Sequence, residues 1–191
     1  RMAYEQMREP GRAAYPVQKC RVEQAPDMAR ELTANGDYDL LFFDLPGTVN
    51  SSGILRTIAR MDYIFAPVSA DQTVLESTLA FLDVLQRMML GKETSRLKGI
   101  YLFWNQVDKR EKSSVYERYG KVIAGMGLPM LAAQIPDTKR FRKELDAENR
   151  AVFRSTLFAD RRLVAGSGLP ELTEEILSIL KLPTYEKTTN R

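Results

Sequence analysis

The sequence predicts an α/β fold, with a mainly parallel sheet flanked by helices on both faces. Short apolar runs alternate along the chain with longer amphipathic segments, which is the order of repeated strand–helix–strand units. The apolar runs are nearly continuous and do not alternate with polar residues. Strands need this composition when both faces of their sheet are buried.

Composition narrows the class of protein. A chain of 191 residues that is 44% hydrophobic can bury a substantial core, so we expect a single domain over residues 1–186 and a flexible polar tail at 187–191. Its one cysteine, Cys20, excludes an intrachain disulfide, which suits the cytoplasm. The lack of histidine excludes histidine-based triads, and no apolar run reaches the roughly 20 residues of a membrane span.

The first part of the chain predicts short elements. We expect a helix at 1–8, a weak strand at 17–24 and a short helix at 27–35 that Gly36 closes. An apolar run at 39–44 predicts a strand, which a Gly/Ser loop and a short helix near 53–60 follow.

The remaining elements alternate regularly. We expect strands at 63–68, 99–105 and 130–136, and helices at 72–89, 114–126, 138–149 and 169–180. In the helix at 72–89 the leucines fall on one stripe, and either Asp71 or Thr73 has the position of its N-cap.

Ligands of parallel sheets bind beyond the carboxyl ends of the strands. Each of the four clear strands in this sequence ends in polar or turn-forming residues, and this convergence is a stronger signal than any single motif. The four ends are Asp44-Leu45-Pro46-Gly47, Pro67 to Asp71, Asn105-Gln106-Val107-Asp108 and Ile135-Pro136-Asp137.

Asp44 follows an apolar strand, as the aspartate of a Walker B motif does. Such a carboxylate holds the water shell of a Mg²⁺ ion beside the phosphates of a nucleotide, and the following Pro46-Gly47 permits close approach of the backbone to a γ-phosphate. The alternative is that Asp44 only caps the loop.

Asn105 and Asp137 are candidates for the base end of a nucleotide. An asparagine after a strand can hydrogen-bond the edge of a purine, and Asp137 can face the same base or the ribose. Each has a structural alternative, because asparagine is common in turns and aspartate is common at helix N-termini.

Four blocks of the chain resemble, in sequence and order, blocks of the ParA/MinD/Soj family. They are YDLLFFDLPG, MDYIFAPVSADQTVLEST, GIYLFWNQVD and IPDTKRFRKE, and the likeness extends over residues 36–180. Members of this family are deviant-Walker P-loop ATPases of DNA partitioning, including plasmid partition, and of cell-division site placement. The stretch RSTLF…RRLVAGS at 154–167 is similar to ParA-like proteins of conjugative transposons.

The resemblance implies a P-loop NTPase-like fold that binds ATP with Mg²⁺, forms a homodimer and hydrolyses ATP slowly. Non-specific DNA and a ParB-like activator protein are the implied partners. By motif, Asp44 corresponds to the Walker B aspartate, Pro46 and Gly47 to the start of switch II, and Asn105 and Asp137 to contacts with the base or ribose.

One departure from the family is clear. The sequence contains neither KGGxGK[ST] nor a general P-loop, and the glycine motifs at 125–127 and 166–168 are misplaced and lack the lysine. We expect that the first strands of the fold are missing from this chain; the alternative is a degenerate relative that never binds ATP. A sheet without a central strand exposes two apolar edges, so we expect the chain alone to pair by its edges or to rearrange.

The densest basic cluster is Lys139, Arg140, Arg142 and Lys143. Such a cluster can bind the DNA backbone through counterion release, but interleaved acidic residues equally suit a solvated helix face. The final helix carries Glu171, Glu174 and Glu175, which disfavours a membrane-binding helix.

Three functions therefore remain. The first is a partition-type ATPase, the second a non-catalytic interaction module of the same fold, and the third a GTPase. The GTPase is suggested by the resemblance of Asn105-Gln106-Val107-Asp108 to the guanine-binding NKxD box.

Overall fold

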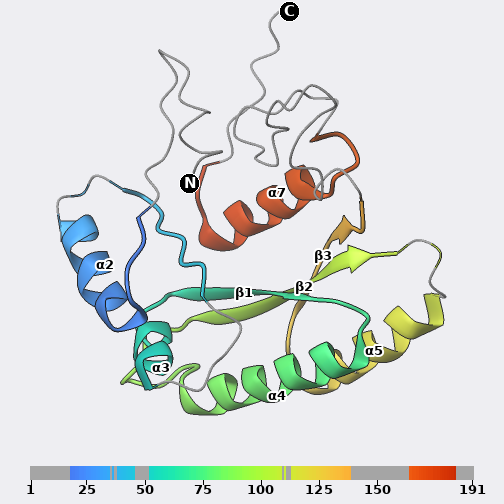
Figure 1. Ribbon diagram of the computed structural model, residues 1–191, viewed down its shortest axis with the longest axis horizontal. Coiled ribbons are helices and arrows are strands. Elements are labelled where there is room, and N and C mark those ends of the chain that lie inside the picture. Colours follow the sequence, from blue (N-terminus) through green and yellow to red (C-terminus); the bar gives the residue numbers. More distant parts are fainter. Residues whose placement is uncertain are drawn as a thin grey trace, which may run out of the picture. The chain divides into compact units, whose positions relative to one another are not determined.

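The computed structural model describes residues 18–34, 36, 38–45, 52–108, 110, 113–138 and 164–183 (Figure 1). Within these residues, three strands form one parallel sheet in the order β1-β2-β3. The strands are β1 (Tyr63–Val68), β2 (Gly99–Val107) and β3 (Met130–Pro136). This confirms the predicted α/β class and the parallel sheet; β1 and β3 have the predicted bounds, and β2 is two residues longer than predicted.

The described helices follow the predicted order. They are a 3₁₀ turn η1 (Val22–Gln24), α2 (Ala25–Ala34), α3 (Ser52–Ile58), α4 (Gln72–Met88), α5 (Ser113–Gly125) and α7 (Leu169–Leu180). Helix α4 buries Leu75, Leu79, Leu82 and Leu85, which is the predicted leucine stripe. Because α4 begins at Gln72, Asp71 and not Thr73 occupies its N-cap position.

Two predicted strands are wrong. Residues 18–21 have no regular structure and 22–24 form η1, because the chain already enters helix α2 at Ala25-Pro26. Residues 39–44 form no strand with any described residue, and Phe42 is 74% exposed. A strand needs an apolar sequence and also a neighbouring strand for its backbone hydrogen bonds. Residues 39–44 have the apolar sequence, but no described strand pairs with them.

Several predictions fall on residues outside the described ranges. These are the helix at 1–8, Pro46 and Gly47, the basic cluster at 139–143, and the helix at 138–149 beyond its first residue. They stay predictions.

The chain divides into two compact units, and strands β1 and β2 contribute residues to both. One unit comprises residues 16–66 and 72–101. In it, the buried Thr57 hydroxyl of α3 donates to the Val22 carbonyl at 2.8 Å and so fastens α3 to η1. The ring of Tyr101 stacks on Phe65 at 5.7 Å, which joins β2 to β1 through their side chains.

The other unit comprises residues 1–15, 67–71 and 102–191. In it, β3 lies between α5 and α7 (Figure 1), so this part of the sheet has helices on both faces. The register shifts between Leu102↔Met130 and Trp104↔Gln134, where two steps along β2 match four along β3. Such an irregularity leaves backbone groups without ladder partners.

Glu175 of α7 satisfies two of these groups. Its carboxylate accepts hydrogen bonds from the backbone N–H of Ala132 at 2.9 Å and of Ala133 at 2.6 Å. Ala133 is buried, and a buried N–H without a partner would be costly. Glu175 therefore fixes α7 onto the irregular part of β3.

Gly168 permits the same docking by having no side chain. It precedes α7 with φ 75°, and a Cβ at this position would lie 2.0 Å from the carbonyl oxygen of Gln134. The buried Ser167 hydroxyl accepts a hydrogen bond from the Leu169 N–H at 3.2 Å. The Gly-Ser-Gly motif at 166–168 thus builds the start of α7 against β3.

We predict that Gly168→Ala lowers the free energy of unfolding by about 2–5 kcal/mol, because it combines overpacking against backbone with a left-handed φ. Gly166→Ala is the matched control, since Gly166 has φ 68° but nothing within 4 Å of its Cβ position. Gly166→Ala should lower the free energy of unfolding by about 1 kcal/mol, from backbone strain alone. Urea unfolding measures both, and equal losses would contradict the packing role of Gly168.

We also predict that Glu175→Ala costs about 1–3 kcal/mol of unfolding free energy, because two strand N–H groups lose their acceptor. The neighbouring Glu174 is exposed, and Glu174→Ala should change stability by less than about 0.5 kcal/mol. Hydrogen exchange provides a second measurement, in which the amides of Ala132 and Ala133 should lose protection only in the Glu175 variant.

Candidate functional site

The carboxyl ends of β2 and β3 lie together in one unit. The backbone N–H of Asp137, directly after β3, donates to the carbonyl of Val107 at the end of β2, at 2.9 Å. The last register pair, Val107↔Pro136, lies at the same place. The structure therefore brings together the two strand ends that carry the predicted residues Asn105 and Asp137.

Asn105 is half-buried on β2, two residues before Val107, where the pairing with β3 ends. Among the described residues, its side-chain amide has no hydrogen-bond partner. A half-buried amide that offers both a donor and an acceptor is suited to a flat polar ligand such as the edge of a base.

Gln106 redirects the strand directly after Asn105. It has φ 56°, a left-handed conformation that costs a residue with a side chain about 1 kcal/mol or more. The register shifts here as well: three steps from Trp104 to Val107 match two from Gln134 to Pro136. The extra residue turns the end of β2, and strain of this kind is frequent beside functional sites.

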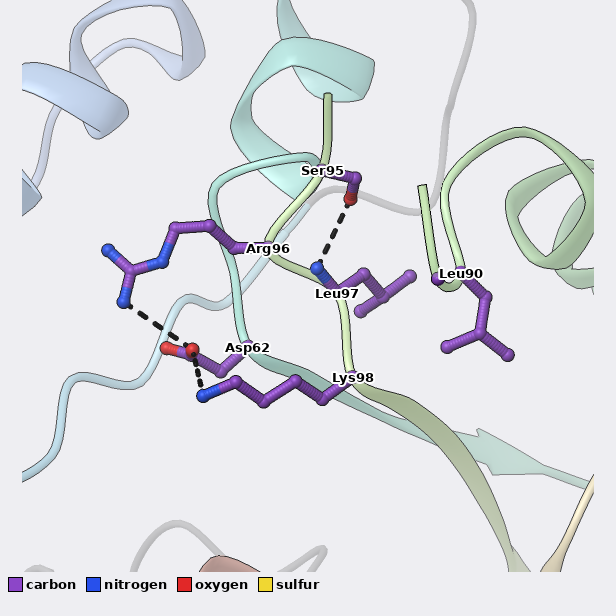
Figure 2. A pocket seen from close by; sticks show the side chains of 7 residues that line it. Asp62, Leu90, Ser95, Arg96, Leu97 and Lys98 are labelled. Carbon is purple, nitrogen blue, oxygen red and sulfur yellow. Dashed lines mark hydrogen bonds and ion pairs between the residues drawn. The ribbon is translucent and has the colours of Figure 1, made fainter. Parts of the chain in front are cut away.

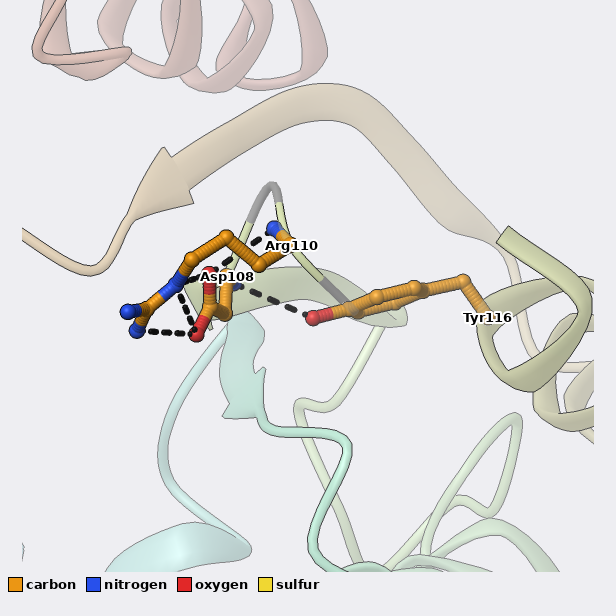
Figure 3. Close-up of polar contacts among 3 residues, drawn as sticks. All are labelled: Asp108, Arg110 and Tyr116. Atoms are coloured by element: carbon orange, nitrogen blue, oxygen red, sulfur yellow. Dashed lines mark hydrogen bonds and ion pairs between the residues drawn. The ribbon is translucent and has the colours of Figure 1, made fainter. Parts of the chain in front are cut away.

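The turn after β2 is fixed by three side chains, Asp108, Arg110 and Tyr116 (Figure 3). The Arg110 guanidinium donates to both carboxylate oxygens of Asp108, with a shortest distance of 2.7 Å from Nη2 to Oδ2. The backbone N–H of Arg110 donates to Oδ1 at 2.9 Å. The Tyr116 hydroxyl of α5 accepts the N–H of Asp108 at 3.2 Å, and its ring meets Trp104 edge-on at 5.1 Å.

The electrostatics of this turn follow from Arg110. Hydrogen bonds from its side chain and backbone, together with its positive charge, lower the pKa of Asp108 to about 2. The pKa of Arg110 is raised, chiefly by its hydrogen bond to Asp108, and the charge of Asp137 adds to this effect. Asp108 is therefore a carboxylate at neutral pH whose oxygens are already engaged, so it is poorly suited to proton transfer.

Asp44 lies in the other unit, in the stretch 38–45 that forms no strand. Its side chain is exposed and has no partner among the described residues. The part of the chain that the structure describes holds no group of three or more acidic, cysteine or histidine side chains that could bind a metal ion. The role of Asp44 at a Mg²⁺ ion stays a prediction.

A shallow hollow of about 610 Å³ lies at the opposite, amino ends of β1 and β2 (Figure 2). Two cations converge there on Oδ1 of Asp62: Lys98 Nζ at 2.9 Å and Arg96 Nη2 at 3.4 Å. The hydrogen bond that Lys98 donates to Asp62, together with the negative charge of Asp62, raises the pKa of Lys98. None of the predicted site residues lines this hollow, and its cations are already neutralised in part, so we do not assign it the ligand site.

Sequence reasoning missed Arg110 and Tyr116. The signal for Arg110 was present, because an arginine two residues after a turn aspartate can reach back to it. Tyr116 carried no such signal, since its role depends on how α5 returns along β2.

No family model and no curated protein matches this chain. Among the residues that the structure describes, no helix combines the length and the apolar character that crossing a bilayer requires. The likeness to ParA/MinD/Soj proteins therefore depends on the ordered sequence blocks alone.

We predict that Arg110→Ala returns the pKa of Asp108 toward the ordinary value of about 3.9. The pKa of Asp108 is lowered in the folded state, so the Asp108–Arg110 pair contributes its full stabilisation at pH values above the ordinary pKa of an aspartate. This contribution is lost as the pH falls toward 2, because Asp108 then becomes protonated. Carboxyl-carbon NMR should show Asp108 titrating near pH 4 in the variant and below pH 3 in the unmodified chain. Arg118→Ala is the control, since Arg118 lies over Tyr119 and should leave Asp108 unchanged.

Proposed function

We propose that the chain is a nucleotide-binding domain of the ParA/MinD type, an ATPase that acts as a homodimer in DNA partition or in the maintenance or transfer of a mobile element. The ordered sequence blocks and the parallel α/β sheet support this proposal. The observation that carries it is the junction of the β2 and β3 ends, where the Asp137 N–H meets the Val107 carbonyl. Asn105 lies near this junction, and its side-chain amide has no partner among the described residues.

In this proposal, Asn105 and Asp137 contact the base or ribose of ATP. Asp44 holds Mg²⁺ through water, and Pro46-Gly47 begins the loop that responds to the γ-phosphate. The described residues fit the base end, since they offer a half-buried amide at a strand end. They provide neither a phosphate cradle nor a metal cluster.

Adenine fits the site better than guanine. A guanine-binding aspartate uses both carboxylate oxygens to accept hydrogen bonds from the base. In this chain, Arg110 already occupies both oxygens of Asp108. The geometry therefore disfavours the GTPase alternative, although Asn105 to Asp108 resembles an NKxD box.

A non-catalytic interaction module is the second candidate. It is favoured by the exposed position of Asp44 outside any strand, and by the absence of a KGGxGK[ST] loop from the sequence. Non-specific DNA, through the basic cluster at 139–143, and a ParB-like activator are proposed partners of the ATPase only.

We predict that residues 1–191 alone show no saturable ATP binding up to about 1 mM, because binding a triphosphate without a phosphate loop leaves its charge uncompensated. Titration with a fluorescent ATP analogue, with and without Mg²⁺, measures this. Micromolar, Mg²⁺-dependent binding would contradict the prediction and would assign a phosphate site to these residues.

The ATPase proposal is tested on the encoded protein, should a KGGxGK[ST] loop precede Arg1. We expect such a protein to prefer ATP to GTP in competition, and Asn105→Ala to weaken ATP binding about tenfold, the loss of one or two hydrogen bonds. Gln134→Ala, on the exposed side of β3, is the control. Absence of both the loop and ATP binding would favour the non-catalytic module.

A further inference from the structure

Three aromatic side chains lie together on one face of the sheet. The ring centroid of Tyr101, on β2, lies 6.4 Å from that of Tyr63 and 5.7 Å from that of Phe65, both on β1. All three side chains are half-buried, whereas Ala66 and Ile100, which alternate with them along the strands, are buried. The rings therefore lie on the more open face of this part of the sheet, and we call them the aromatic patch.

Gly99 allows the Tyr101 ring to lie along β2. A Cβ at Gly99 would lie 2.6 Å from Cε2 of this ring, so the ring occupies the space that a side chain at position 99 would fill. The ring of Phe65 is tilted from it by only 21°. Neighbouring rings that are nearly parallel can extend their stack to a further flat group, such as a nucleic-acid base.

Two exposed cations border the aromatic patch. The side chains of Arg96 and Lys98 are 66% and 61% exposed, and both reach toward the carboxylate of Asp62 (Figure 2). The ammonium group of Lys98 also lies 5.9 Å from the ring centroid of Tyr63. The positive charges and the rings thus form one continuous surface within the unit of residues 16–66 and 72–101.

Asp62 neutralises only part of this positive charge. The backbone N–H of Arg96 donates to the carbonyl of Ala59 at 2.8 Å, which brings the next residue, Arg60, beside the same segment. Arg60 is exposed and has no ion-pair partner among the described residues. Of these four charged groups, three are positive, so the border of the aromatic patch suits a polyanion.

We propose that the aromatic patch and its bordering cations bind single-stranded nucleic acid. One or two unpaired bases stack on the rings of Tyr101 and Phe65, and the phosphates beside them contact Lys98 and Arg96. Proteins that bind single strands without sequence preference combine rings and positive charges in this way. The bases must be unpaired, because those of a duplex are covered by their neighbours in the helix. This inference does not depend on the proposed function, and it differs from the DNA contact proposed for the basic cluster at 139–143, which needs only phosphates.

Binding is tested on residues 1–191 by fluorescence anisotropy with labelled oligothymidine and oligouridine strands of about 12 nucleotides. We expect a dissociation constant on the order of 10–100 µM at about 50 mM salt, with DNA and RNA alike, since stacking needs no 2′-hydroxyl. An abasic strand of the same length keeps the charge and should bind at least about tenfold more weakly. Equal binding of the abasic strand, or no saturable binding up to about 1 mM, would overturn the proposal.

NMR of the unmodified chain tests the contact directly. Base stacking should move the ring-proton resonances of Tyr63, Phe65 and Tyr101 as the strand is added. Tyr119 on α5 is the internal control, because it is also half-buried and has the guanidinium of Arg118 over its ring at 5.1 Å. Shifts at Tyr119 as large as those at Tyr101, or none at the aromatic patch, would contradict the assignment.

Ring substitutions separate stacking from charge. Tyr101→Ala should weaken binding at least about tenfold, whereas Tyr101→Phe keeps the ring and should stay within about twofold. Tyr119→Ala should leave binding unchanged. Circular dichroism checks that each variant folds, and a folded Tyr101→Ala variant with full affinity would overturn the stacking role.

Charge substitutions test the border. Arg96→Gln combined with Lys98→Gln should reduce the slope of log K against log salt by about 1.4, the value for two phosphate contacts on a single strand. Arg118→Gln combined with Lys121→Gln removes the same charge from exposed positions of α5 and should leave the slope unchanged. An equal change in slope for both double variants would show that only the net charge of the chain matters and would overturn the proposal.

Discussion

The backbone pairing of β2 with its two neighbours is the constraint on which the described structure depends. Helix α4 connects β1 to β2, helix α5 connects β2 to β3, and α7 follows β3 in the chain. Both β1 and β3 pair with β2, so each of these helices joins or follows a strand of the sheet that β2 centres. Leu102 is fully buried and Trp104 nearly so, which makes β2 the most enclosed strand of the sheet. The β2–β3 pairing departs from regular register at two places, and each place has a side chain or a turn that compensates for it.

Most of the fold could be predicted because its elements depend on local sequence. The bounds of β1, β3 and α7 follow from apolar runs that end at clear turn residues, and the leucine stripe of α4 follows from helical periodicity. The strand predicted at 39–44 failed for a different reason. Its apolar sequence is strand-like, but pairing depends on which segment lies beside it, and no local pattern contains that information.

The candidate site was predictable to the level of strand ends and no further. The rule that ligands meet the carboxyl ends of parallel strands selected Asn105 and Asp137, and the structure ties those two ends together by one backbone hydrogen bond. The rule says nothing about Arg110 or Tyr116, which decide whether the carboxylate of Asp108 is available to a ligand. Selectivity in this turn thus depends on side chains that lie outside any motif.

Gly168 has a consequence for the comparison of related sequences. Wherever α7 docks on β3 in this way, natural selection should retain glycine at this position, because any Cβ meets the Gln134 carbonyl. An invariant Gly-x-Gly before a helix is also the usual signature of a phosphate-binding loop. In this chain, conservation of that signature would report the packing of a helix against a strand and would carry no information about nucleotides.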